Sequence, residues 1–324
     1  MRRHDETPLL KIPKAADVRA AARHIQSLVV TTPVLDNPNI SNELGVNVLF
    51  KCENLQRSGA FKFRGALNAV TGLLETESVQ GLATHSSGNH GLALATAAAL
   101  HDLPAEIVVP ENAVTSKIKA IEAAGGRVHL CSPTQRDREA GLARLVKQGL
   151  TPVPPYDHPL VIAGQGTAAL EFIDHSPQLD AIMTPVGGGG LLAGTCLAVA
   201  EQNSGARVYA AEPAGADDAY QSLQAGERIV DVIPDTIADG LRATIGELTF
   251  PIIQRHVQEI FRVSDQDTIA AMRLIWEQLK LIIEPSSATV MAALIRYRER
   301  FQGQTVGLIL SGGNLDLDNI PFDH

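Results

Sequence analysis

Short runs of apolar, mostly β-branched residues alternate along the chain with longer stretches rich in alanine. This alternation is typical of parallel strands joined by helices, so the sequence predicts an α/β fold. The predicted strands cover residues 46–50, 82–85, 106–109, 127–131, 181–186, 208–211 and 306–310. The predicted helices cover residues 91–100, 116–124, 138–147, 191–201, 266–279 and 288–300.

A proline-rich segment indicates how the chain divides into domains. With 324 residues, the chain exceeds the usual size of a single domain. Pro152, Pro154 and Pro155 cannot continue a helix or a central strand, so we place a domain crossing there. We expect a small inserted domain of residues 80–155 and a large domain built from residues 1–79 and 156–324.

Charge and hydropathy narrow the class of protein. The formal net charge is -9 at pH 7 and the basic residues are scattered, which argues against a nucleic-acid partner. No apolar run approaches the ~20 residues that cross a bilayer, and residues 9–12 are too short for the core of a signal peptide. We therefore expect a cytoplasmic protein with no membrane partner. Cys52, Cys131 and Cys196 are widely spaced, which suits free thiols in a reducing compartment.

Three glycine-containing turns each follow a predicted strand. They are Ser-Ser-Gly-Asn-His-Gly at 86–91, a segment at 187–194 that opens with four glycines, and Ser-Gly-Gly-Asn at 311–314. In open α/β sheets, ligands bind beyond the carboxyl ends of strands, where backbone N–H groups and helix N-termini face anions. We expect these turns to hold several anionic groups.

The tetraglycine segment is the strongest candidate for phosphate binding. Four consecutive glycines cost conformational entropy that a simple turn does not require, and they let successive N–H groups surround one phosphate. The alternative is a dinucleotide fingerprint, since Gly188, Gly190 and Ala193 fit G-x-G-x-x-A and Glu212 ends the next strand. This loop alone leaves both open, whereas no P-loop motif occurs.

Lys62 is the candidate nucleophile. It lies between Phe61 and Phe63, with Arg64 close by in the sequence. Apolar burial and neighbouring cations both disfavour the ammonium form, which would free the amine to attack an aldehyde. The alternative is a partly exposed lysine whose stem packs on aromatic rings, and this segment alone does not separate the two.

Several segments together carry a family resemblance through their order and spacing: residues 58–66, 86–91, 161–167, 187–190, 211–213, 237–240, 283–285 and 311–314. They resemble the serine racemase and threonine/serine dehydratase family of fold type II enzymes, which use pyridoxal 5'-phosphate (PLP). The resemblance spans about residues 16–317 and favours PLP over a dinucleotide. It implies a tryptophan synthase β-like enzyme of two lobes, each an open, mostly parallel twisted sheet flanked by helices, with PLP in the large domain.

The resemblance also implies roles in the cofactor site. Lys62 would bind PLP covalently and later take the α-proton, while Phe61 would pack against the ring and Asn89 would bind its phenolic oxygen. Ser311 would face the pyridine nitrogen, and a hydroxyl there favours β-elimination over transamination because it does not hold this nitrogen protonated. The residues that would hold the phosphate are Gly187, Gly188, Gly189, Gly190 and Leu191.

The substrate carboxylate, by the same resemblance, would be held by Ser86, Ser87 and His90 together with backbone N–H groups. Ser87 matches the acid/base of racemase members, so racemisation is a side activity to consider. The alternative for Ser87 is a helix N-cap, which its position before an alanine-rich helix fits equally well.

A divalent-cation site is implied as well. Glu212, Asp218 and the carbonyl oxygen of Ala216 match its ligands in the family, and hard oxygen ligands suit Mg or Ca. The alternative is a solvated acidic turn. Asp239 and Glu284 are weaker assignments, which we place outside the proton-transfer path.

The substrate pocket departs from the vertebrate serine racemase pattern. Tyr156 replaces an asparagine and Ala243 replaces a serine, and residues 154–157 resemble catabolic threonine dehydratases instead. Arg138 matches an arginine that faces a second carboxylate in racemase and hydroxyaspartate dehydratase relatives. It could equally be a surface residue in the charged run 136–139, while Ala243 leaves room for an aromatic substituent.

The sequence thus predicts a PLP-dependent ammonia-lyase that converts a β-hydroxy-α-amino acid of the L-threonine or L-serine type to a 2-oxo acid and ammonia. The alternatives are a 3-hydroxyaspartate or phenylserine dehydratase and a serine racemase with side dehydratase activity. A non-catalytic or NAD-binding protein that shares these loops is a third class. A homodimer is expected.

Overall fold

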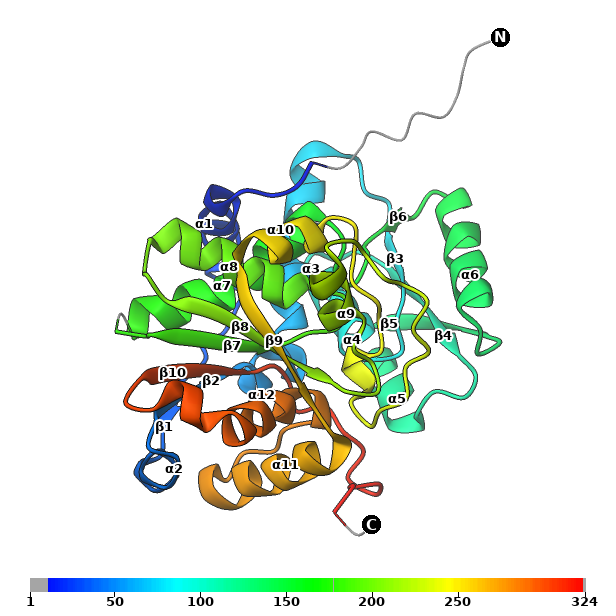
Figure 1. Cartoon of the computed structure of the whole chain (residues 1–324). Helices are drawn as coiled ribbons and strands as arrows, with labels where there is room; N and C mark the ends of the chain where they lie inside the picture. Colours follow the sequence, from blue (N-terminus) through cyan, green and yellow to red (C-terminus); the bar gives the residue numbers. More distant parts are fainter. Residues whose placement is uncertain (1–10, 177, 323–324) are drawn as a thin grey trace.

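Two β-sheets organise the protein. The computed structural model describes residues 11–176 and 178–322, so most of the N-terminal segment considered for a signal peptide lies outside the described residues. One sheet has six strands and the other has four, and helices cover their faces (Figure 1). The predicted α/β class is therefore confirmed. Within the described ranges, no helix is long and apolar enough to cross a membrane.

The six-stranded sheet has the strand order β1-β2-β10-β7-β8-β9. β1 is antiparallel to β2, and all other neighbours are parallel. Because β2 and β10 pair directly, both ends of the chain contribute to this sheet. Its strands are β1 (Val34–Asp36), β2 (Asn47–Cys52), β7 (Ala181–Pro185), β8 (Arg207–Pro213), β9 (Val257–Val263) and β10 (Thr305–Leu310).

The four-stranded sheet is entirely parallel, with the order β5-β4-β3-β6. Pro152 lies in the edge strand β6, where its missing N–H group is not needed for a further ladder. This sheet falls within the small domain expected at residues 80–155, whose boundaries stay a prediction. Its strands are β3 (Leu82–His85), β4 (Ala105–Pro110), β5 (Gly126–Cys131) and β6 (Thr151–Pro152).

Helices pack on both faces of the large sheet. One hydrophobic core lies between the sheet and α2, α11 and α12, and a second lies between the sheet and α1, α7, α8 and α10. The helices are α1 (Ala15–Ile25), α2 (Pro38–Leu44), α3 (Lys62–Thr76), α4 (Asn89–Ala99), α5 (Thr115–Ala123), α6 (Gln135–Lys147), α7 (Pro159–His175), α8 (Gly190–Gln202), α9 (Asp218–Ala225), α10 (Thr249–His256), α11 (Asp265–Leu279) and α12 (Pro285–Arg296).

Helix α3 joins the two sheets, since it packs on α7 beside the large sheet and on α4 beside the small one. A third hydrophobic core surrounds it, with side chains from α3, α4, β3 and β4. The residue that begins α3 is Lys62, so the candidate nucleophile is placed where the two parts of the molecule meet.

Every strand and helix expected from the sequence is present. The strand ends differ from expectation by at most two residues, whereas α12 ends at Arg296 because the chain continues as a short 3-10 helix at Arg298–Phe301. The sequence did not reveal β1, β6 and β9, nor the helices α1, α2, α3, α7, α9 and α10.

Candidate active site

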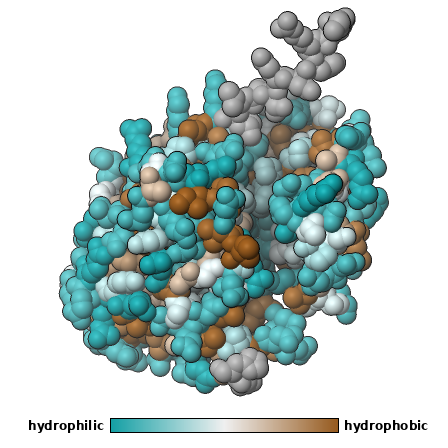
Figure 2. Space-filling model, turned by 45° about the vertical axis from the view of Figure 1, so that its right-hand side comes forward, coloured by the Kyte–Doolittle hydropathy of each residue, from teal (hydrophilic) through white to brown (hydrophobic). Residues whose placement is uncertain are grey.

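The segment that carries Lys62 is joined to the loop after β10, although the two lie far apart in the sequence. The backbone N–H of Phe61 donates to the carbonyl oxygen of Ser311 at 2.9 Å, and Gly313 N–H donates to the Gly59 carbonyl oxygen at 2.9 Å. The surface is hollowed between the larger and the smaller part of the molecule (Figure 2). The predicted glycine turn after β10 is therefore brought to the start of α3.

The amine of Lys62 is buried although the residue as a whole is half-exposed. Its Nζ donates to the carbonyl oxygen of Pro155 at 2.7 Å and lies 5.1 Å from the centroid of the Phe61 ring. Burial lowers the pKa of this amine from 10.5 to about 8, while the charge of Glu284 opposes the shift. The predicted perturbation by apolar burial is thus present in the structure.

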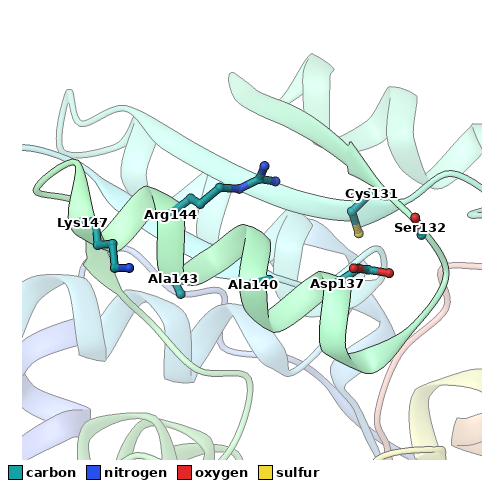
Figure 3. Close-up of a pocket in the computed structure, with 7 residues that line it drawn as sticks. All are labelled: Cys131, Ser132, Asp137, Ala140, Ala143, Arg144 and Lys147. Carbon is teal, nitrogen blue, oxygen red and sulfur yellow. The ribbon is translucent and has the colours of Figure 1, made fainter.

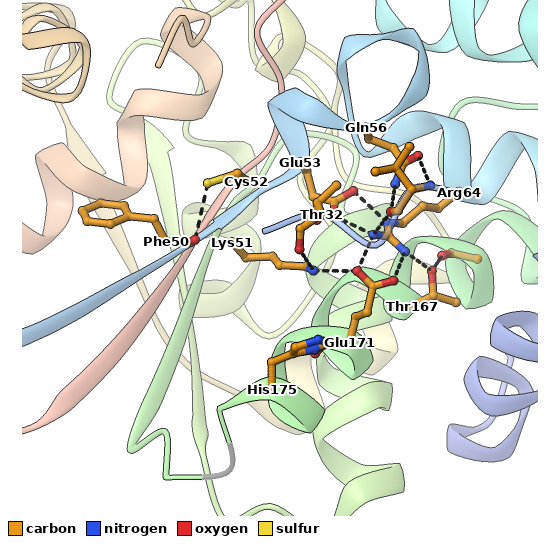
Figure 4. A network of polar contacts seen from close by, with 12 residues as sticks. Thr32, Phe50, Lys51, Cys52, Glu53, Gln56, Arg64, Thr167, Glu171 and His175 are labelled. Carbon is orange, nitrogen blue, oxygen red and sulfur yellow. Dashed lines mark hydrogen bonds and ion pairs between the residues drawn. The ribbon is translucent and has the colours of Figure 1, made fainter. Parts of the chain in front are cut away.

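Arg64 does not contribute to that shift, contrary to the expectation that neighbouring cations lower the pKa of Lys62. Its guanidinium is buried on the other side of α3, where Nε donates to Glu53 at 2.7 Å and Nη2 donates to Glu171 at 2.8 Å (Figure 4). Lys51 donates to the same Glu171 carboxylate at 2.5 Å. These four side chains form a buried ion network that fixes the first turn of α3.

The tetraglycine segment presents unused hydrogen-bond donors. None of the hydrogen bonds among the described residues uses the backbone N–H groups of residues 187–192, although all of these residues are buried. Helix α8 starts here, and its N-cap Gly189 has φ +87°, a conformation that favours glycine. Buried N–H groups are nearly always paired, so this arrangement fits an anionic ligand.

The glycines also have a packing role that the entropy argument from the sequence left out. A Cβ atom on Gly188 would lie 2.4 Å from the ring of Tyr156, and one on Gly190 would lie 3.0 Å from the Tyr156 Cβ. Tyr156 follows Pro155, the residue that accepts the Lys62 hydrogen bond. One short segment therefore contacts both the amine and the tetraglycine loop.

Asn89 and Glu284 meet in this region. Asn89 Nδ2 donates to Glu284 Oε1 at 2.8 Å, and Asn314 donates to Asn89 Oδ1 at 2.9 Å. Burial raises the pKa of Glu284 to about 8, and the charge of Asp239 adds to the increase. The sequence analysis treated Glu284 as a weak assignment. The fold brings its carboxyl group to Asn89, which is expected to bind the cofactor.

The loop after β3 leaves the start of α4 open. The N-cap is Gly88 and no side chain caps the helix, so the interpretation of Ser87 as an N-cap is wrong. His90 is buried, and its Nε2 pairs with the Val153 carbonyl oxygen at 2.9 Å. Burial, followed by the charge of Lys62, lowers the pKa of His90 to about 3, so the ring is neutral and donates this hydrogen bond.

Arg138 lies on α6, which packs against β3. Its charge lowers the pKa of His85, the last residue of β3, although burial of His85 is the larger cause. Arg138 is half-buried, and its Nε is buried with no hydrogen-bond partner among the described residues. This placement differs from that of a solvated surface arginine and leaves a cationic donor near the predicted substrate loop.

Comparison with known proteins decides the family. Residues 25–312 match the family described as pyridoxal-phosphate dependent enzyme. The chain belongs to this family. It is 46% identical to the serine racemase of Dictyostelium discoideum, covering 94% of this chain and 95% of that one. It is 42% identical to the β-hydroxyaspartate dehydratase of Paracoccus denitrificans, covering 96% and 99%.

A solved structure agrees with this assignment. The T.th. threonine deaminase is 39% identical and superimposes with a TM-score of 0.89, covering 94% of this chain and 99% of that one. The predicted fold type II architecture is confirmed, and the dinucleotide-binding alternative for residues 188–193 is set aside. The names of these relatives differ in substrate and reaction, so the family alone does not fix either one.

The residues of this PLP-dependent enzyme fit its cofactor. The unpaired N–H groups at 187–192 suit a phosphate, and an amine with a pKa near 8 suits covalent attachment of an aldehyde. Lys62 and the tetraglycine loop would therefore hold the two ends of PLP. The roles of Phe61, Asn89 and Ser311 toward the cofactor stay predictions.

The predicted cation site of the PLP-dependent enzyme contains two buried carboxyl groups. Glu212 accepts backbone hydrogen bonds from Ala219 at 3.0 Å and Tyr220 at 2.8 Å, and Asp218 accepts one from Ile245 at 2.7 Å. Burial raises both pKa values, that of Asp218 to about 6, and the charge of Asp218 further raises that of Glu212. Among the described residues, no group of three or more Asp, Glu, His or Cys side chains is arranged to hold a metal ion, so cation binding stays a prediction.

A separate cavity of about 470 Å³ lies along α6 and the end of β5 (Figure 3). It contains none of the residues predicted for the active site. Its lining residues are Cys131, Ser132, Asp137, Ala140, Ala143, Arg144 and Lys147.

Proposed function

We propose that this PLP-dependent enzyme is an ammonia-lyase that removes water and then ammonia from a β-hydroxy-α-amino acid with a second carboxylate, of the 3-hydroxyaspartate type. The observation that carries the substrate class is the buried, unpartnered Nε of Arg138 beside the loop after β3. A guanidinium pairs with a carboxylate through two parallel hydrogen bonds. The name of the Paracoccus denitrificans relative supports the same class.

Proton removal is assigned to Lys62. Bound PLP supplies an electron sink that makes the substrate α-proton acidic. Because burial lowers the pKa of Lys62 to about 8, its neutral amine is present near neutral pH and can accept this proton.

The open N-terminus of α4 is proposed to bind the α-carboxylate of the substrate. Its uncapped N–H groups and the positive end of the helix dipole favour an anion, and Ser86 and Ser87 add hydroxyl donors. His90 has already committed its ring N–H to Val153, so we assign it a backbone contact. Ser87, which does not cap the helix, is the group proposed for a side racemase activity.

A substrate panel tests the proposal. We expect release of ammonia and a 2-oxo acid from L-threo-3-hydroxyaspartate with a higher kcat/KM than from L-serine, L-threonine or phenylserine. If none of the four releases ammonia, the enzyme is not an ammonia-lyase. If L-threonine is the best substrate, the dicarboxylate assignment is wrong and the enzyme acts on the smaller hydroxy amino acids.

The variant Arg138→Gln separates the role of the arginine from general damage. Loss of charge-assisted hydrogen bonds to a carboxylate should lower kcat/KM for 3-hydroxyaspartate about 10- to 100-fold. The value for L-serine should change little, because serine has no second carboxylate. Arg136→Gln, at an exposed position of the same helix, is the matched control and should leave both values unchanged.

A further inference from the structure

Thr249, the first residue of α10, stabilises the tetraglycine loop through hydrogen bonds. Thr249 is fully buried, and its hydroxyl donates to the carbonyl oxygen of Gly188 at 2.9 Å. The same hydroxyl oxygen accepts the N–H of Gly246 at 3.0 Å, and this N–H also approaches the Gly188 carbonyl at 3.3 Å. One carbonyl of the loop is therefore held by two donors from a segment outside it.

These bonds fix the direction of a peptide group. In a trans peptide the C=O and the next N–H point in opposite directions, and no described peptide bond is cis. Because the Gly188 carbonyl points toward Thr249, the N–H of Gly189 points to the opposite side of the loop. That N–H belongs to the run of buried donors that lack an acceptor among the described residues.

Asp157 binds residues 246–248, the segment next to Thr249, through hydrogen bonds. Its two carboxylate oxygens accept the N–H groups of Glu247 and Leu248, each at 2.8 Å. A Cβ atom on Gly246 would lie 2.3 Å from Asp157 Oδ1, so only glycine at this position allows the segment to approach the carboxylate this closely. Asp157 thus anchors residues 246–248, and these residues anchor the Gly188 carbonyl.

We propose that Thr249 and Asp157 are positioning residues for the cofactor phosphate, which set the tetraglycine N–H groups in the orientation that binds this anion. The inference rests on the PLP site described above. It extends the set of residues that determine phosphate binding to two side chains that do not themselves face the ligand.

Binding of PLP and of pyridoxal, which lacks the phosphate, to the apoenzyme tests this inference. Titrations followed by the change in visible absorbance give a Kd for each compound, and their ratio measures recognition of the phosphate. Thr249→Val should raise the Kd for PLP about tenfold, as expected for one misplaced hydrogen-bond donor, and leave the Kd for pyridoxal unchanged. Thr249→Ser, which keeps the hydroxyl, should restore the wild-type ratio.

Two further variants complete the experiment. Asp157→Asn removes one acceptor and should weaken recognition of the phosphate in the same direction, so it serves as the test if Thr249→Val does not fold. Thr268→Val is the control, because Thr268 is also buried and donates to a helix carbonyl, that of Ser264, at 2.9 Å. It should leave both Kd values as in the wild type.

An unchanged ratio in Thr249→Val and Asp157→Asn, or equal weakening of both compounds, would overturn the inference. Failure of the PLP site itself would be recognised separately, because the wild-type protein would then bind PLP no better than pyridoxal.

Discussion

Glu171→Gln should destabilise the protein strongly, because Glu171 neutralises two buried cations at once. Its carboxylate accepts hydrogen bonds from Lys51 and Arg64, whose side chains are 0% and 1% exposed (Figure 4). The variant leaves these two positive charges with the single carboxylate of Glu53. Removing one partner of a buried ion pair costs about 3–5 kcal/mol, and the polar amide places this variant near about 3 kcal/mol.

Thermal unfolding measures this loss. A chain of 324 residues unfolds with an entropy of about 0.7 kcal/mol/K, so about 3 kcal/mol corresponds to a Tm lower by about 4 °C. Glu201→Gln is the matched control, since Glu201 pairs with Arg19 at 2.8 Å on the surface and such pairs contribute ~0–1 kcal/mol. Equal and small shifts in both variants would refute the view that the network holds the first turn of α3.

Other expectations concern charge, metal and proton transfer. Because burial lowers the pKa of Lys62 from 10.5 to about 8, covalent binding of PLP to the apoenzyme should accelerate as pH rises and level off above about 8; a rate independent of pH would contradict this. Addition of Mg or Ca should raise the Tm of the wild type and not that of Asp218→Asn, whereas no shift in the wild type would exclude the cation site. Ser87→Ala should reduce racemisation of L-serine more than ammonia release, and equal losses would leave Ser87 a positioning role only.

Several of the strands that the sequence revealed are buried on both faces. Strands such as β7 and β10 read as continuous apolar runs, because helices cover both sides of a parallel sheet. β9, which was missed, lies at the edge of the sheet and mixes buried and exposed residues. α3 was missed because the glycines and β-branched residues along it give a weak helical signal, and packing against α4 and α7 stabilises it instead.

The location of the candidate site could be predicted from the sequence because its glycine motifs follow predicted strands. Parallel strands of one sheet place their carboxyl ends at one edge, so the convergence of the glycine turns after β7 and β10 could be expected, whereas the turn after β3 belongs to the other sheet. The direction in which individual side chains point could not be predicted from the sequence. Arg64 was expected to act on Lys62, but residues two apart on a helix do not face each other, and Arg64 turns to Glu53 and Glu171. The hydrogen bond from Thr249 to the Gly188 carbonyl oxygen joins segments that lie far apart in the sequence, so no local pattern encodes it.

The central claim is that Lys62 is the residue that binds PLP covalently. Borohydride reduction of the PLP-loaded protein, followed by proteolysis and mass spectrometry, identifies the modified lysine directly. The account predicts a phosphopyridoxyl group on the peptide that contains Lys62, and no such group after the same treatment of Lys62→Ala. Modification of a different lysine in the wild type, or none at all, would contradict it.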